Sequence, residues 1–113
     1  MILKINKRVI QAEVADNFWK KAKGMMFAEE KKNILFTFSR EGKYGFWMPF
    51  VRFPILICFA DNKKKILQIK KAVPITFSPK TWKIYRPKQK IKYVLELAED
   101  INAKEGDIIQ VQR

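Results

Sequence analysis

The sequence predicts a mainly β (β-rich α+β) fold: a single compact domain that forms an antiparallel β-barrel-like or folded-over sheet and has two short helices. Apolar and polar residues alternate in most segments, which is typical of strands with one buried face. Helical signals are short and do not alternate with strands in the βαβ rhythm of a parallel sheet. Closing or folding over the sheet would hide its edges. The length of 113 residues suits one domain, so residues 1–113 are expected to form a single unit.

The N-terminal region predicts a β-hairpin followed by a helix. Residues 3–5 and 10–14 alternate apolar and polar side chains, and residues 6–8 between them form the expected connection. A helix of about two turns is expected over residues 16–24, because Asp16 suits the N-cap, the last turn is basic and a glycine ends the segment.

The middle of the chain predicts a strand and then a second hairpin. Residues 34–38 alternate apolar side chains toward one face. Residues 55–60 are continuously apolar, as expected of a strand that is covered on both faces. Residues 61–64 turn this strand back into residues 66–69, so the two strands are expected to pair.

The C-terminal part is less regular. Residues 73–89 contain three prolines and are expected to form a long excursion with one short strand at residues 83–85. A strand over residues 93–97, a helical turn over residues 99–104 and a last strand over residues 108–112 complete the predicted fold.

One segment, residues 44–54, combines five aromatic residues, a methionine, a glycine and two prolines. This composition is typical of the centre of a core or of the wall of a binding cleft, and the prolines favour irregular backbone. Met26, Trp47 and Met48 are therefore candidate ligand contacts, although Met and Trp also fill irregular volumes in a core. The sequence leaves both interpretations open.

Three further residues are candidate ligand contacts. Trp82 and Tyr85 lie in the excursion, where an aromatic ring is less obliged to be buried and can stack on a ligand. Glu96 alternates with Leu95 and Leu97 and is expected to point outward. It is either a ligand-orienting carboxylate or the partner of a surface cation.

The chain carries a formal net charge of +13, which favours acidic or polyanionic partners. A basic face is expected from seven residues: Lys63, Lys64, Lys65, Lys70, Lys71, Lys83 and Arg86. Together with Trp82 and Tyr85, this face fits weakly sequence-specific binding of single-stranded nucleic acid, although a solvated face has the same composition. Most of the cations are Lys, which weakens the case for bidentate recognition of phosphates or bases.

The residue types exclude several chemistries. With no His and a single cysteine, the chain has no Ser-His or Cys-His pair, no His-ligated metal and no internal disulfide. We therefore predict no catalytic residues, no metal site and no cofactor, and an enzyme is the least supported class. Cys58 lies in an apolar strand and is expected to be an inert core thiol. No apolar run suits a membrane span or a signal peptide, so a cytoplasmic protein is expected.

Several motifs, in the same order, resemble those of uncharacterised protein family 0127, also called domain-of-unknown-function family 192, over residues 8–111. They are Gly24-Met25-Met26-Phe27, Phe46-Trp47-Met48, Pro54-Ile55 with Phe59-Ala60-Asp61, and Tyr93-Val94-Leu95-Glu96-Leu97 with Gly106-Asp107. The resemblance implies a compact β-rich domain without an assigned activity. Members of that family typically follow Trp-Met with Lys-Asn-Thr, where this chain has Pro49-Phe50-Val51. This departure implies a more apolar site.

Two functions stay open from the sequence. The first is a noncatalytic ligand-binding or interaction domain that uses the aromatic and Met-rich segment as a cleft for a small molecule or polymer. The alternative is binding of nucleic acid or an acidic protein through the basic face. The sequence does not indicate the oligomeric state.

Overall fold

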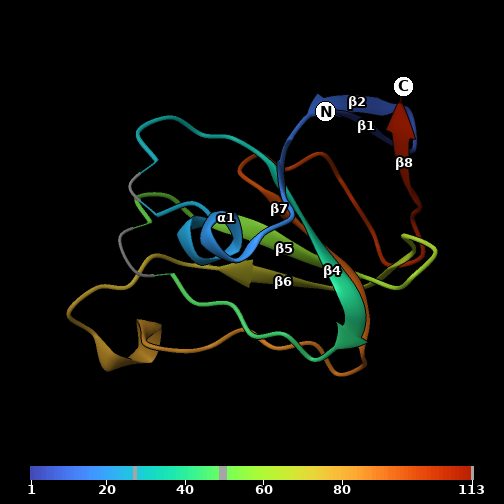
Figure 1. The fold of residues 1–113 in the computed structure, drawn as a ribbon. Coiled ribbons are helices and arrows are strands. Elements are labelled where there is room, and N and C mark those ends of the chain that lie inside the picture. The colour runs from blue at the N-terminus through green and yellow to red at the C-terminus, as the bar shows by residue number, and fades with distance from the viewer. Residues whose placement is uncertain (27, 49–50, 113) are drawn as a thin grey trace.

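The structure is a computed structural model that describes residues 1–26, 28–48 and 51–112 (Figure 1). Its strands form a three-stranded sheet in the order β2-β1-β8 and a five-stranded sheet in the order β3-β4-β7-β5-β6. The elements are β1 (Ile2–Ile5), β2 (Arg8–Gln11), β3 (Glu13–Ala15), α1 (Phe18–Lys23), β4 (Ile34–Gly42), β5 (Ile55–Ala60), β6 (Ile66–Ala72), the 3₁₀ turn η1 (Pro79–Thr81), β7 (Ile91–Leu97) and β8 (Ile109–Gln112). The mainly β fold with short helices is confirmed.

The small sheet is built around the predicted N-terminal hairpin. β1 pairs antiparallel with β2, and Asn6 takes the left-handed conformation (φ 56°) that tight turns require. β8 pairs with the other side of β1, so the N- and C-terminal strands lie side by side (Figure 1). The expected single strand over residues 10–14 is wrong, because the chain leaves the small sheet at Ala12. β3 then joins the large sheet.

The large sheet has β7 at its centre, between β4 and β5, and its pairs are antiparallel except for β3 and β4. The predicted hairpin of β5 and β6 is confirmed. The parallel β3–β4 pair begins where the Glu13 N–H donates to the Asn33 carbonyl (2.9 Å). The buried Asn33 side chain also bonds Gln11 O and Ala98 N, both at 3.1 Å. This residue therefore ties the crossover between the two sheets to the end of β7.

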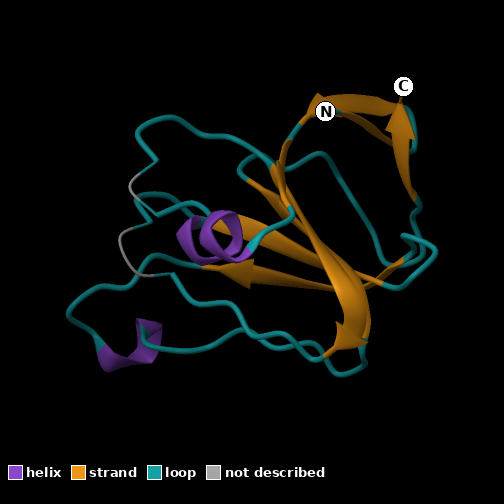
Figure 2. Ribbon diagram, in the orientation of Figure 1, coloured by secondary structure: helices purple, strands orange, loops and turns teal. Residues whose placement is uncertain are grey.

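The two faces of the large sheet carry separate cores. Leu35, Cys58 and Leu95 face the small sheet, and their cluster includes Leu3 and Ile109 from β1 and β8. The opposite face carries a second cluster that contains Phe36, Ile57, Phe59 and Val94, together with parts of the aromatic segment. The sheets are thus folded over each other without closing into a barrel, and α1 lies on the second face (Figure 2).

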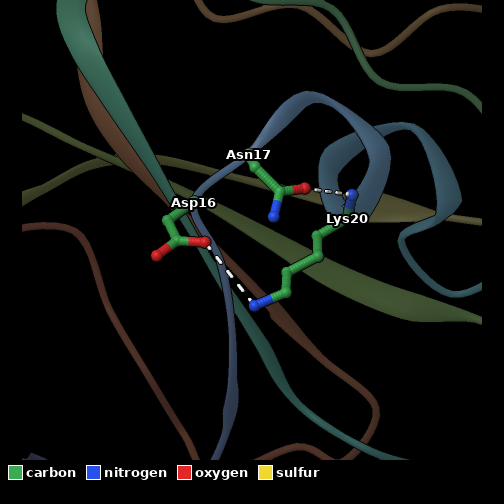
Figure 3. A network of polar contacts seen from close by, with 3 residues as sticks. All are labelled: Asp16, Asn17 and Lys20. Carbon is green, nitrogen blue, oxygen red and sulfur yellow. Dashed lines mark hydrogen bonds and ion pairs between the residues drawn. The ribbon is translucent and has the colours of Figure 1, made fainter.

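Helix α1 is shorter than predicted, and its N-cap lies one residue later. Its N-cap is Asn17 rather than Asp16: the Asn17 Oδ1 accepts the Lys20 N–H (2.9 Å) (Figure 3). Asp16 instead forms an exposed ion pair with the Lys20 Nζ (3.6 Å). Gly24 ends the helix at φ 48°, a conformation that other residues rarely adopt.

Two expected elements of the C-terminal part are wrong. Residues 99–104 form no helical turn, because the Asp100 carboxylate accepts the Asn102 N–H (2.8 Å) and Asn102 is left-handed (φ 58°). The second helical element lies instead at Pro79–Thr81 within the excursion. The expected strand at residues 83–85 is reduced to a single antiparallel bridge between Tyr85 and Phe46.

Cys58 lies in β5 with no exposed surface, and burial raises the pKa of its thiol to about 12, with a smaller contribution from Asp107. Because the thiolate is the reactive form, we expect the native protein to resist labelling by 5,5′-dithiobis(2-nitrobenzoate) at pH 8. The urea-unfolded protein, as the control, should release one thiol equivalent promptly. Labelling of the folded protein as fast as of the unfolded protein would contradict this burial.

A candidate ligand-binding cleft

A cleft of about 350 Å³ opens between the end of α1, strand β4, the central strand β7 and the aromatic segment. Its volume lies within the range of small-molecule sites. Apolar side chains form most of its lining: Met25, Met26, Phe36, Phe38, Tyr44, Phe46, Trp47, Met48 and Val51. Two lysines, Lys21 and Lys23, and the acidic residue Glu96 also line it.

The aromatic wall is held by ring contacts and backbone pairing. Phe36 and Phe38 are two residues apart on β4 and therefore project to the same face. Phe38 stacks on Tyr44 with ring centroids 3.8 Å apart, and Phe36 meets Phe46 edge to face at 5.1 Å. Phe46 is fixed in turn by two backbone hydrogen bonds with Tyr85, Phe46 N to Tyr85 O (2.9 Å) and the reverse (2.6 Å). The wall is therefore preformed.

Glu96 is the polar group at the inner side of this cleft. It lies on β7 directly opposite Ile34 of β4 and Ile57 of β5, and only 4% of its surface is exposed. Burial among these apolar neighbours raises the pKa of its carboxyl from 4.5 to about 8. The expectation that Glu96 points outward is wrong, because both faces of the large sheet are covered and the face opposite Leu95 is the cleft side.

The Glu96 carboxyl has no ionic partner within the part of the chain that the structure describes, where the ion pairs are Lys20–Asp16 and Lys32–Glu13. Lys21 is half-buried at the rim, with its Nζ 4.4 Å from the centroid of the Phe38 ring. Lys23 is exposed. The cleft therefore combines an aromatic wall, a buried carboxyl and cations at its mouth.

Gly24 brings the backbone close to this carboxyl. A Cβ at this position would lie 3.4 Å from the Phe36 ring and 3.7 Å from the Glu96 Oε1. Its left-handed φ would also strain any other residue. The glycine that ends α1 thus shapes the cleft beside Glu96.

The structure brings together four of the six candidate contacts. Met26, Trp47, Met48 and Glu96 line the cleft. Residues 44–54 include both core and cleft residues. The Met48 side chain is buried, whereas the Trp47 side chain is 62% exposed at the mouth of the cleft. Phe27, Pro49 and Phe50, which belong to the motif and aromatic segments, lie outside the described residues.

Tyr85 and Trp82 lie elsewhere. Tyr85 is 4% exposed and belongs to the core, where its hydroxyl accepts the Val73 N–H (3.1 Å), so the expected exposed ring is wrong. Trp82 is exposed, as expected, but it does not line the cleft.

The basic residues are spread over the surface. Lys63, Lys64 and Lys65 lie in the turn before β6, and Lys70 and Lys71 lie near its other end, about 20 Å away at the rise of a strand. Lys83 and Arg86 are exposed on the excursion. No group of three or more acidic, His or Cys side chains that could hold a metal occurs in the described ranges. None of the described helices is long and apolar enough to cross a membrane.

Sequence reasoning missed Lys21, Phe36 and Phe38 as lining residues. The alternation of Phe36 and Phe38 placed both rings on one face, but nothing in the sequence showed that this face meets the end of α1.

Two solved structures share this fold. A protein of unknown function from Novosphingobium aromaticivorans superposes with a TM-score of 0.83 at 20% identity, over 97% of this chain and 84% of that one. A protein from Sinorhizobium meliloti, described as a putative transcription regulator, superposes with a TM-score of 0.80 at 19% identity, over 96% and 89%. At these identities the likeness concerns the fold alone.

Sequence relatives agree with the motifs. A UPF0127 protein of Pyrococcus abyssi is 29% identical over 109 residues, which cover 88% of this chain and 85% of the relative. A UPF0127 protein of Pyrococcus horikoshii is 28% identical over 109 residues, with 88% and 86% covered. The model of the family DUF192, described as an uncharacterized ACR, matches residues 1–111. The chain therefore belongs to the DUF192 family, whose relatives here carry the name UPF0127, and the resemblance read from its motifs is confirmed.

Proposed function

We propose that this protein is a noncatalytic ligand-binding domain whose cleft holds a small molecule, or one end of an extended one, with an apolar body and one polar group directed at Glu96. The observation that carries the proposal is a carboxyl only 4% exposed that lines a cleft and has no ionic partner among the described residues.

Burying a carboxyl is unfavourable unless it forms hydrogen bonds, so a carboxyl that is buried against a cleft is suited to bind a polar group of a ligand. At neutral pH the raised pKa leaves Glu96 largely protonated, able both to donate and to accept a hydrogen bond. The stacked rings of Phe38 and Tyr44 and the Phe36–Phe46 pair supply the apolar contact surface. A ligand with this bipartite character would bury its body on the rings and satisfy the carboxyl.

Binding is favoured over catalysis by the position of the lysines. An acid-base pair would need a lysine desolvated beside Glu96. Lys23 is exposed and Lys21 directs its Nζ to the Phe38 ring at the rim. The cleft thus supports recognition better than proton transfer.

Two matched probes test the proposal: tryptophol, which ends in a hydroxyl, and 3-ethylindole, which lacks it. We expect both to shift the backbone amide NMR signals of Gly24, Phe38 and Met48. The wild-type protein should prefer tryptophol about fivefold, the effect of one net hydrogen bond.

The variant Glu96→Leu should bind both probes and lose this preference, whereas Glu99→Gln, a change at an exposed acidic residue outside the cleft, should keep it. The proposal fails if neither probe shifts the cleft residues at millimolar concentration. It also fails if the preference for tryptophol survives in Glu96→Leu.

The alternative, a nucleic-acid surface, has less support. It relied on two exposed rings among the basic residues, and the ring of Tyr85 is buried. Localisation in the cytoplasm remains part of our proposal.

A further inference from the structure

We propose that the excursion between β6 and β7, together with Trp47, forms a docking surface for an anionic lipid bilayer. The surface comprises Trp47, Phe77, Trp82 and Ile84 with the cations Lys80 and Arg86. The surface shares Trp47 with the mouth of the cleft, but the inference does not require a ligand in the cleft.

The apolar part of the surface comes from two segments that the Phe46–Tyr85 bridge places side by side. This register sets Trp47 opposite Ile84, and both are exposed. The Ile84 Cγ2 lies over Gly45, only 2.6 Å from where a Cβ would stand, so a side chain at position 45 would displace it. Phe77 is fully exposed and Trp82 is 60% exposed in the same excursion. Large apolar groups that are exposed on neighbouring segments, as Trp47 and Ile84 are, mark interaction sites.

The loop that presents Phe77 and Trp82 is built by its own hydrogen bonds. The Thr76 N–H donates to the Thr81 Oγ1 (2.8 Å), which donates to the Ser78 carbonyl (2.8 Å). The Trp82 Nε1–H donates to the Thr76 carbonyl (2.6 Å). Because the only polar group of the indole is already paired, the ring can enter an apolar phase without losing a hydrogen bond to water. These bonds also tie the residue before Phe77 to Thr81 and Trp82.

The charge of this region selects an anionic partner. No Asp or Glu occurs from residue 62 to residue 95. The excursion instead carries exposed cations at Lys80, Lys83, Arg86, Lys88 and Lys90. Juxtaposed basic and aromatic side chains bind interfaces that contain anionic lipids, where the aromatic rings lie at the headgroup level.

The shape of the region favours a bilayer over a protein or a nucleic acid. The excursion with η1 projects at the corner of the molecule far from the two termini (Figure 1). A protruding Phe77 fits a soft surface that it can penetrate, whereas a protein would have to supply a pocket of matching shape. Stacking of successive bases would use neighbouring open rings, and Tyr85 is buried.

Vesicle co-sedimentation tests the proposal with the intact protein. We expect binding to phosphatidylcholine vesicles that contain about one-third phosphatidylserine, and little binding to pure phosphatidylcholine, at an ionic strength of about 0.15 M. The variant Phe77→Ser should weaken binding about tenfold, because it removes one inserted ring. The double variant Lys80→Gln with Arg86→Gln should weaken it about tenfold or more.

The matched control, Lys7→Gln with Lys31→Gln, changes the net charge equally at exposed positions outside the excursion and should bind like the wild type. Each variant is used only if its melting temperature matches that of the wild type. The proposal is overturned if Phe77→Ser binds vesicles as well as the wild type, which would leave only nonspecific attraction. It is equally overturned if the wild type ignores vesicles and binds single-stranded oligothymidylate in a manner that depends on Trp82.

Discussion

Replacing Glu96 by glutamine is expected to remove a large loss of stability that the wild-type protein suffers as the pH rises. In the folded protein the pKa of this carboxyl is about 8, against an ordinary value of 4.5. The unfolded chain therefore releases the proton above pH 4.5 while the folded state still holds it. The contribution of Glu96 to the free energy of unfolding therefore falls between pH 4.5 and about 8 and is constant above that range. At about 1.4 kcal/mol per pH unit, the loss is about 4–5 kcal/mol.

The measurement is urea unfolding of the wild type and of Glu96→Gln at pH 5 and at pH 8. The difference in the free energy of unfolding between the two proteins isolates the effect of Glu96 from that of the other carboxyl groups. As the pH rises, the variant should become more stable relative to the wild type by several kcal/mol. The control Glu99→Gln, at an exposed position, should follow the wild type. Parallel curves for the wild type and Glu96→Gln would contradict a raised pKa for this buried carboxyl.

Replacing Phe59 by alanine is expected to destabilise the protein by about 3–5 kcal/mol, a large part of the usual 5–15 kcal/mol of a domain. Phe59 has no exposed surface and lies in β5, opposite Val94 of the central strand. Its ring also contacts that of Phe46, with centroids 6.2 Å apart, so the cavity would lie beneath the aromatic wall of the cleft. Denaturant midpoints and slopes measure the change.

The matched control is Phe77→Ala, which removes the same side chain from a fully exposed position and should change the free energy of unfolding by no more than about 0.5 kcal/mol. A loss below about 1 kcal/mol for Phe59→Ala would mean that the β5 core is not packed as described. Equal losses in the two variants would contradict the assigned exposure of Phe77.

Local patterns predicted the elements whose partners are close in the sequence. The hairpin of β5 and β6 followed from two apolar runs separated by a short polar turn, and α1 followed from its basic last turn and Gly24. The pattern did not locate the break at Ala12, because β2 and β3 continue the same alternation and only their partners differ. Likewise, Asp100 made the region after β7 a turn through a side-chain bond that competes with a helix.

For the candidate site as well, local patterns predicted some residues, and the rest depended on contacts between distant segments. The dense aromatic segment identified one wall, and Met26, Trp47, Met48 and Glu96 were found from the sequence. The alternation places Glu96 and Leu95 on opposite faces of the sheet. It indicates which face meets solvent only when one face of the sheet is uncovered. Because the small sheet covers one face and the aromatic segment the other, both faces of β7 are interior.

By itself, the sequence determined the family, the mainly β class, the cationic surface and the absence of His chemistry, since each depends on composition, on motif order or on neighbours along the chain. Only the tertiary structure decided that Tyr85 is buried, that Phe36 and Phe38 face the end of α1, and that Glu96 enters the cleft without an ionic partner among the described residues. These are contacts between segments distant in sequence. Their burial depends on which strands pair and which faces are covered, and a local pattern carries no information about either.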